Sequence, residues 1–371
     1  MGGVVGSIVP RPGSNGHANR HIQHQSAPLP PTTGSPLFSI FIPTRNDAGW
    51  LSDAIDSARA QTVGDWELVI GDNVSEDATR EVATVDDTRV RYHRWESVVD
   101  VNGNFNRTAA LCTGEWLVPL GSDDRLQPHA LATFAEQIRN RADLVMVVAA
   151  CSRIDQDGHP AAGTWRFYQG MARLSPGDYD AASWMAALSA EGQPPWNLGS
   201  IAFRRSAVEQ LGGLFNPDAG PAADIELVMR MPLAGPVRYL DEPVMIFTQR
   251  TDSDAKVQQQ SNRLGSGDTI LARALRVGIA AHEHWRGPLR TSERRMVNGL
   301  IARSFIQRAA QHRLLAGGAG RRGAFADLRN AWRTSPTTVL TPRQLVYSAG
   351  AILAPAGLLR AADRALRLDR A

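Results

Sequence analysis

The chain has 371 residues, of which 43% are hydrophobic and 21% charged, and these ordinary globular values exclude a fully disordered chain, collagen and a coiled coil. This length suffices for one large domain or two ordinary ones with a sizeable core. The net charge of +3 is the sum of unequal parts, because residues 271–371 hold 18 arginines against 5 acids, a net of +13, and residues 1–270 carry −10. Such an asymmetry predicts that the basic tail faces a polyanion or a membrane.

Residues 1–35 are rich in Gly, Pro, Ser, Asn, His and Gln, which predicts a disordered leader with little to bury. The leader shows no signal peptide, and no window of the chain reaches about 18 uninterrupted apolar residues, so we expect no spanning helix. The two cysteines, Cys112 and Cys151, lie in apolar runs and are expected to be buried free thiols. Together these features predict a cytoplasmic protein.

Strands and helices are predicted to alternate from Leu37 onward. Short runs rich in β-branched, aliphatic and aromatic residues predict strands at 38–42, 66–70, 89–93, 116–120 and 144–150. Helical spacing predicts helices at 51–60, 79–84, 104–112 and 128–140. The alternation predicts an α/β fold with a mostly parallel central sheet and helices on both faces. Ligands of such sheets bind beyond the carboxyl ends of the strands.

The remaining sequence changes in character twice. Residues 155–195 are loop-rich and carry several aromatic side chains, which predicts a substrate-facing insertion. From about residue 270 the pattern becomes helical and rich in arginine, with helices expected at 268–282, 296–315 and 344–359. We therefore divide the chain into a leader at 1–35, an α/β domain at 36–268 and a basic, mostly helical extension at 269–371.

Polar clusters follow three of the predicted strands, at the point where each strand ends. They are Thr44-Arg45-Asn46, the run from Asp72 to Asp77, and Ser122-Asp123-Asp124. Neighbouring carboxylates repel one another and raise each other's pKa, and a divalent cation removes that cost. Asp123 and Asp124 are therefore candidates to bind Mg²⁺ or Mn²⁺ together with a diphosphate. The alternative is that the pair caps the helix that begins near Pro128.

Several ordered blocks of the sequence are similar to one known family. The blocks are Ser39-Ile40-Phe41-Ile42-Pro43-Thr44-Arg45-Asn46, Trp66-Glu67-Leu68-Val69-Ile70-Gly71-Asp72, Gly114-Glu115-Trp116 continuing to Asp124, Gly199-Ser200-Ile201-Ala202-Phe203-Arg204-Arg205, and Asp224-Ile225-Glu226-Leu227. Through them, residues 37–255 resemble the family 2 glycosyltransferases, which are inverting nucleotide-sugar enzymes of the GT-A fold. The resemblance implies that residues 36–268 form a GT-A catalytic domain, and it names no substrate.

The resemblance implies a nucleotide site at the ends of the first two strands. Pro43, Thr44 and Asn46 would line the base and ribose, and Asp72 would accept a hydrogen bond from the base. Two local alternatives stay open. Asn46 could instead cap the following helix, and Asp72 could form only an Asx-type turn with Ser75.

The resemblance also implies which groups carry the reaction. Asp123 would contact the ribose or the metal, Asp124 would ligate Mn²⁺ or Mg²⁺, and Asp224 would be the general base. Such a base deprotonates an acceptor hydroxyl, which attacks the anomeric carbon opposite the leaving nucleoside diphosphate, while the metal offsets the charge on that diphosphate. The alternative is that Asp224 is a plain N-cap of the helix over 225–231.

Two positions depart from the family pattern. Gly121 stands where the family commonly has Asp, and Arg250 stands where a metal-binding His is expected. Arginine has no lone pair for a cation but binds phosphate through two N–H groups. We therefore hypothesise that Arg250 contacts the diphosphate and partly replaces a metal ligand.

Three further features leave alternatives open. Trp196 and Asn197 either hold an acceptor sugar or form a packing corner, and Arg204 and Arg205 either face the diphosphate or are surface charges. The basic helices either pack on the catalytic domain or rest on an anionic membrane surface, which would place the protein at the inner face of the membrane. Nucleic acid is not expected as a partner, because the basic tail has few aromatic residues and the body is acidic.

The sequence thus predicts an inverting glycosyltransferase that moves a sugar from a nucleotide diphosphate donor, with a UDP-sugar expected, to a glycan or a lipid-linked saccharide. One alternative is a nucleotidyltransferase, although Pro43-Thr44-Arg45-Asn46 is not the Gly-rich basic loop that such an enzyme needs. The other is a non-catalytic sugar-nucleotide binder, which Gly121 and the missing His keep open.

Overall fold

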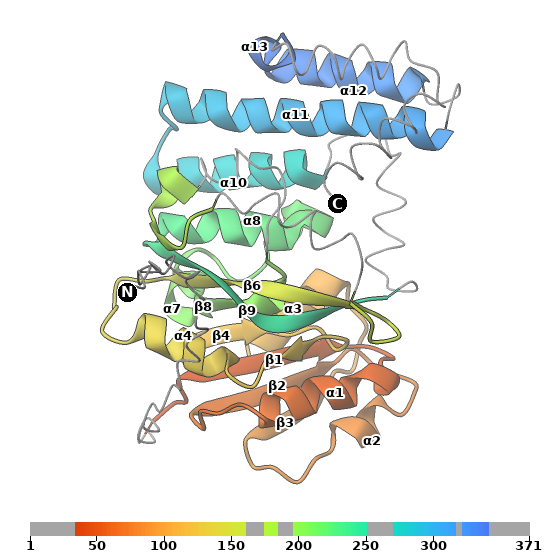
Figure 1. The fold of residues 1–371 in the computed structure, drawn as a ribbon, viewed down its shortest axis with the longest axis vertical. Helices are drawn as coiled ribbons and strands as arrows, with labels where there is room; N and C mark the ends of the chain where they lie inside the picture. Colours follow the sequence, from red (N-terminus) through yellow and green to blue (C-terminus); the bar gives the residue numbers. More distant parts are fainter. Residues whose placement is uncertain (1–33, 161–173, 185–195, 251–269, 317–320, 341–371) are drawn as a thin grey trace, which may run out of the picture.

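The computed structural model describes residues 34–160, 174–184, 196–250, 270–316 and 321–340. Within these parts, helices cover both faces of a central sheet, and further helices stack on one side (Figure 1). The strand order of the sheet is β3-β2-β1-β4-β8-β6-β9-β5, and β7 pairs with β9. The predicted α/β class is confirmed.

The first half of the sheet consists of four parallel strands. They are β1 (Phe38–Thr44), β2 (Trp66–Asp72), β3 (Val90–Arg94) and β4 (Trp116–Pro119). β1 lies between β2 and β4, and Thr44 is the register partner of Asp72 at the end of the β1–β2 ladder. Because the four strands run in one direction, their carboxyl ends meet at the same edge of the sheet.

Side chains of β1 alternate between two apolar cores, one on each face of the sheet. Ile40 and Ile42 pack with Leu51 in the first core, while Phe41 belongs to the second. Helices α1 (Ala48–Arg59), α2 (Thr79–Ala83) and α4 (Ala130–Ile138) cover the first face, and α3 (Val101–Ala109), α7 (Arg205–Gln210) and α8 (Ala223–Arg230) cover the second.

The second half of the sheet is mixed. It consists of β5 (Arg125–Leu126), β6 (Met146–Asp155), β7 (Gly177–Tyr179), β8 (Ile201–Arg204) and β9 (Val237–Gln249). β8 is antiparallel to both β4 and β6, so β6 and its parallel partner β9 run in the same direction as β4. β9 therefore ends at the same edge as β1, which brings Arg250 to that edge. The strand predicted at 144–150 continues to Asp155, because β9 pairs with it along its whole length.

Three long helices follow the sheet and stack beyond α8 (Figure 1). They are α10 (Ile270–Arg286), α11 (Thr291–Ala316) and α12 (Arg321–Thr334), and the short α13 (Pro336–Val339) comes last. An apolar core joins Met229 of α8 to Leu275 of α10 and Phe305 of α11. Arg308 of α11 and Asp327 of α12 form a buried ion pair at 2.6 Å, which holds α12 on α11.

The helices predicted at 268–282 and 296–315 are thus confirmed, and the contact of α10 with α8 supports the alternative in which the tail packs on the catalytic domain. The helix predicted at 344–359, nearly all of the leader and much of the insertion at 155–195 lie outside the described residues. No helix in the described parts is both long enough and apolar enough to span a bilayer.

Candidate functional site

The loops that follow β1 and β2 are tied together through Asn46. Its backbone N–H donates to Ser75 Oγ at 2.9 Å, and its side-chain Oδ1 accepts from the backbone N–H of Glu76 at 2.8 Å. Asn46 has a φ of +54°, in the left-handed region that Asn tolerates better than most residues. The N-cap position of α1 is Asp47, so Asn46 fixes the shape of the loop after β1 and does not cap the helix.

Asp72 lies fully buried at the end of β2 and is held by three hydrogen bonds. Its Oδ1 accepts from the backbone N–H of Ser75 at 2.9 Å and from Ser75 Oγ at 2.5 Å, and its Oδ2 accepts from the Tyr92 hydroxyl at 2.6 Å. Burial and the Asp72 carboxylate raise the pKa of Tyr92. The turn with Ser75 is therefore present, and contact of Asp72 with a nucleotide base stays a prediction.

Thr44 and Pro43 complete this side of the edge. Thr44 is 2% exposed, and its Oγ1 is buried without a hydrogen-bond partner among the described residues. A buried hydroxyl with no partner is uncommon, because leaving it unpaired costs about 1–3 kcal/mol. Thr44 is thus a suitable group to bind a ligand at the end of β1.

Asp123 and Asp124 follow β4, where protein atoms replace much of the water around their carboxyl groups. Asp124 is 4% exposed, and its Oδ1 accepts from the backbone N–H of Thr248 in β9 at 2.9 Å. Burial, and then the negative charge of Asp123, raise the pKa of Asp124 well above its usual value. Burial also raises the pKa of Asp123, against the lowering effect of Arg250. The N-cap of α4 is His129, so neither aspartate caps that helix.

Arg250 lies beside these carboxylates, directly beyond the end of β9. Its Nη1 is 2.8 Å from Asp47 Oδ1 and 3.5 Å from Asp123 Oδ2, and its guanidinium stands 5.2 Å from the centre of the Trp50 ring. Ser122 Oγ donates to the other oxygen of Asp47 at 2.6 Å. Asp47 and Asp123 thus both approach Nη1 of Arg250, and Asp47 makes the shorter contact. We call Asp47, Asp123, Asp124 and Arg250 the strand-end cluster.

Asp47 and Trp50 lie at the site but were not predicted from the sequence as site residues. The only available signal was that Asp47 immediately follows the polar cluster at the end of the first strand. Its partner Arg250 is 203 positions away, so no local pattern connects the two.

Gly121 leaves room for the two carboxylates to converge. A Cβ at this position would lie 2.8 Å from Asp124 Oδ2 and 3.1 Å from Asp123 Oδ1. Oxygen atoms from two acids thus face the same small space, and each acid carries a raised pKa. Hard divalent cations favour such oxygen ligands, and their charge would relieve the repulsion. The residues fit a divalent cation, with Asp124 and Asp123 as ligands.

Asp224 is placed at the start of α8 and is accessible to solvent. Its Oδ1 accepts from the backbone N–H of Ile225 at 2.8 Å. Asn102, at the start of α3, donates to Gly220 O at 2.7 Å and thereby holds the turn before α8 against the carboxyl edge of the sheet. Surrounding protein displaces part of the water around Asp224, and this desolvation raises the pKa of the carboxyl. A carboxylate that is exposed and more basic than usual suits a general base.

Two other predicted candidates lie away from this edge. Arg204 pairs with Glu115 at 2.5 Å and Arg205 donates to Gly114 O at 2.7 Å, at the opposite end of β4. They do not face the strand-end cluster. Trp196 is 8% exposed and stacks on Trp184 at 5.5 Å, which supports the packing corner.

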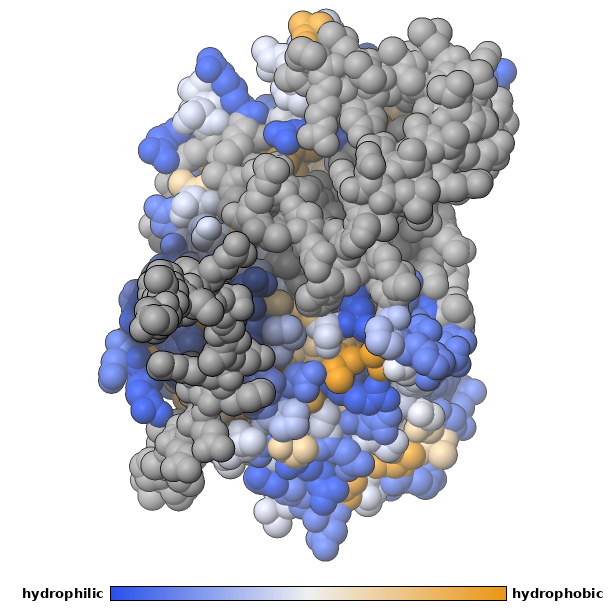
Figure 2. Space-filling model, viewed as in Figure 1, coloured by the Kyte–Doolittle hydropathy of each residue, from blue (hydrophilic) through white to orange (hydrophobic). Residues whose placement is uncertain are grey.

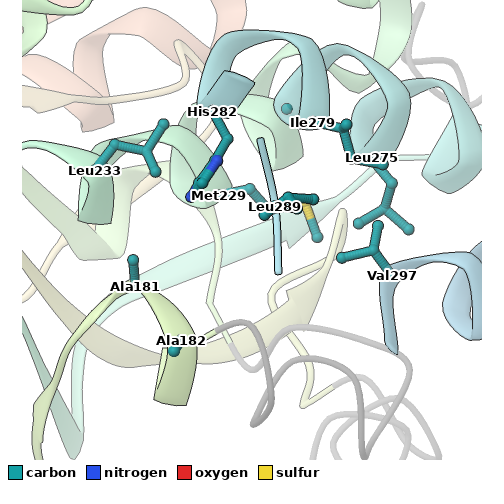
Figure 3. A pocket seen from close by; sticks show the side chains of 10 residues that line it. Ala181, Ala182, Met229, Leu233, Leu275, Ile279, His282, Leu289 and Val297 are labelled. Carbon is teal, nitrogen blue, oxygen red and sulfur yellow. The ribbon is translucent and has the colours of Figure 1, made fainter. Parts of the chain in front are cut away.

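An apolar pocket lies between α8 and α10 (Figure 3). Met229, Leu275 and Val297 are among the residues that line it. His282 is the single titratable residue of the lining, and its Nδ1 lies 3.1 Å from Gly287 O. A lining of this kind offers no set of groups for transfer chemistry, so the strand-end cluster is the candidate site.

Comparisons with known proteins agree with this geometry. The profile of the family described as Glycosyl transferase family 2 matches residues 39–190. A PGL/p-HBAD biosynthesis glycosyltransferase of Mycobacterium tuberculosis is 42% identical over 96 residues, which are 25% of this chain and 37% of that protein. Chondroitin synthase of Escherichia coli is 30% identical over 127 residues, which are 33% of this chain and 18% of that protein.

Among solved structures, S. aureus TarS is similar with a TM-score of 0.58 and 14% identity, over 90% of this chain and 53% of that one. At this identity the likeness concerns the fold alone. The sheet and its covering helices have the GT-A fold. The family match over residues 39–190 agrees with that fold and covers less than half of the chain. The matched segment spans little more than a third of the mycobacterial relative.

The fit at Gly121 can be tested with Gly121→Ala. The added methyl group would push the carboxylates of Asp123 and Asp124 apart. We expect Mn²⁺ affinity to fall roughly 10–100-fold, which is the usual effect of mutating residues that position metal ligands. Isothermal titration with Mn²⁺ in the presence of UDP measures this. Gly49→Ala is the matched control, since a Cβ there meets nothing within 4 Å. Equal Mn²⁺ affinity in both variants would show that cation binding does not need the space left by Gly121.

Proposed function

We propose that the chain is an inverting glycosyltransferase that takes its sugar from a nucleotide diphosphate donor, with a UDP-sugar expected. The observation that carries this proposal is the strand-end cluster, in which two desolvated acids and one arginine meet at the carboxyl edge of a GT-A sheet. This edge is where ligands of such sheets bind. The family 2 match over residues 39–190 supports the same reaction class.

The donor would lie across the ends of β1, β2 and β4. Pro43, Thr44 and Asn46 would line its base and ribose, with Asp72 close by, because Thr44 and Asp72 are register partners at this edge. Arg250 would bind the diphosphate, since its guanidinium is already oriented by Asp47 and has several N–H groups.

Asp124 and Asp123 would hold Mn²⁺ or Mg²⁺. When bound, this cation supplies positive charge that stabilises the leaving diphosphate. The protein's own part is to keep the two acids close together in a desolvated site and to position Arg250 beside them.

Asp224 would act as the general base. It would take the proton of the acceptor hydroxyl while that oxygen forms a bond to the anomeric carbon, and the electron pair of the broken bond would leave on the diphosphate. The solvent access of Asp224 leaves room for an acceptor, and its raised pKa makes the carboxylate a stronger base. An accessible base beside the donor edge also favours an enzyme over a non-catalytic binder.

The acceptor is proposed to be a glycan or a lipid-linked saccharide. The chondroitin synthase relative supports a glycan, and the net charge of +13 over residues 271–371 supports work close to an anionic membrane surface. We propose that the protein acts in the cytoplasm at the inner face of a membrane, through the outer surface of its basic C-terminal helices, while α10 packs on α8 of the catalytic domain.

Asp224→Asn tests the proposed function most simply. We expect sugar transfer to fall about 10²–10⁴-fold, the usual contribution of a general base, with donor affinity unchanged. The measurement is Mn²⁺-dependent release of nucleoside diphosphate from a panel of sugar nucleotides. Asp218→Asn is the matched control, because Asp218 is an exposed acid on the segment that precedes α8. Full turnover in Asp224→Asn would refute the base assignment, and no release from any donor by the wild type would refute the function.

The pH profile provides a second readout of the same residue. A general base must be deprotonated, so activity should fall as the pH drops through the raised pKa of Asp224. We therefore expect kcat/KM to fall on the acid side at a pH above the ordinary pKa of an aspartate. In Asp224→Asn this fall at low pH should be absent.

Arg250→Ala tests the diphosphate contact. Loss of a charged hydrogen-bonding group should weaken donor binding about 10–100-fold. Arg250→Lys keeps the charge but not the two-pronged geometry, so it should recover only part of the affinity. Arg205→Ala, at the other end of the sheet, is the control. Unchanged donor affinity and turnover in Arg250→Ala would contradict the contact.

A further inference from the structure

The outward face of α12 combines exposed aromatic and basic side chains. Phe325 and Trp332 are 52% and 48% exposed, although most residues of their size are buried in the described parts. Arg322 and Arg329 are also exposed and complete a stripe at spacings of three and four residues, which places all four on one side of the helix. Arg333 is exposed one turn after Arg329.

The same face carries no negative charge. Asp327 is the single acid of α12, and it is 2% exposed because it points inward to its ion pair with Arg308. The ion pair thus fixes which side of α12 faces out. Among the residues that the structure describes on α12, this surface holds aromatic rings and arginines and no acid.

The position of α12 leaves this surface open. Helices α10 and α11 lie between α12 and α8, so α12 forms the outer layer of the helical stack (Figure 1). In the space-filling view of the same side, a small hydrophobic patch is visible at the top edge, where α12 and α13 lie (Figure 2). Helix α8, whose first turn carries Asp224, is separated from α12 by these two helices.

We infer that the α12 face, defined by Arg322, Phe325, Arg329, Trp332 and Arg333, docks on an anionic lipid bilayer. Arginines near such a surface are attracted to acidic headgroups, and Trp and Phe insert at the level of the headgroups. The positive charge of this face is complementary to an anionic bilayer and not to a neutral bilayer. The inference rests on the membrane association proposed above and names the surface responsible.

Vesicle co-sedimentation of the full chain tests this inference, with vesicles of phosphatidylcholine alone or mixed with phosphatidylglycerol. We expect binding to the mixed vesicles only, weakened by salt. Phe325→Ala/Trp332→Ala and Arg322→Gln/Arg329→Gln should each reduce the partition coefficient about tenfold or more. All four positions are exposed, so the fold should be retained, and release of nucleoside diphosphate from the donor should stay at the wild-type level.

Matched controls separate the α12 face from general charge and hydrophobicity. Val98→Ala/Val101→Ala removes exposed apolar side chains elsewhere, and Arg80→Gln/Arg139→Gln removes exposed charges from the α/β domain. Both should bind vesicles like the wild type.

Three results would overturn the inference. If wild type binds vesicles but the α12 variants bind equally well, another surface is responsible. If wild type binds no vesicles, the membrane association itself is wrong, while donor turnover would still stand as a separate result. If the α12 variants instead dissociate a dimer in the absence of lipid, the face is a contact between two copies of the chain.

Discussion

The site depends on one electrostatic constraint, which is the burial of two adjacent carboxylates at the end of β4. Asp124 is nearly out of contact with water, and Asp123 is next to it in the chain. Burial disfavours ionisation of both groups and raises the pKa of each, and the negative charge of Asp123 adds to this effect at Asp124. Positive charge is therefore needed nearby. Arg250 supplies part of this positive charge. A divalent cation, which the residues fit, would supply the remainder.

The fold meets this constraint by bringing distant strands to one edge. β4 carries the acids, β9 contributes the backbone N–H of Thr248 that holds Asp124, and the residue after β9 is Arg250. The loop after β1 supplies Asp47, which pairs with Arg250 at 2.8 Å. β8 is antiparallel to its neighbours, and this reversal makes β9 end at the same edge as β1 and β4. The strand directions thus decide which charges meet.

Much of this edge could be predicted from the sequence, because its parts carry local signals. Apolar runs marked β1, β2 and β4, and the polar residues directly after them include Asn46, Asp72 and the acid pair. The pairing of Asp47 with Arg250 could not be predicted, since it joins residues 203 positions apart and depends on the path of β9. The length of β6 was underestimated for a similar reason, because its last residues are polar and are strand only through their pairing with β9. The outward face of α12 also depends on a tertiary contact, the ion pair that turns Asp327 inward.

We propose above that Asp123 and Asp124 hold a cation that binds the donor diphosphate next to Arg250. The most direct measurement is a crystal structure of the protein with UDP and Mn²⁺, with anomalous scattering recorded at the manganese edge. We predict one strong anomalous peak between the carboxylates of Asp123 and Asp124, with the diphosphate in contact with both the ion and the Arg250 guanidinium. An anomalous peak elsewhere, or a diphosphate bound away from this cluster, would contradict the account.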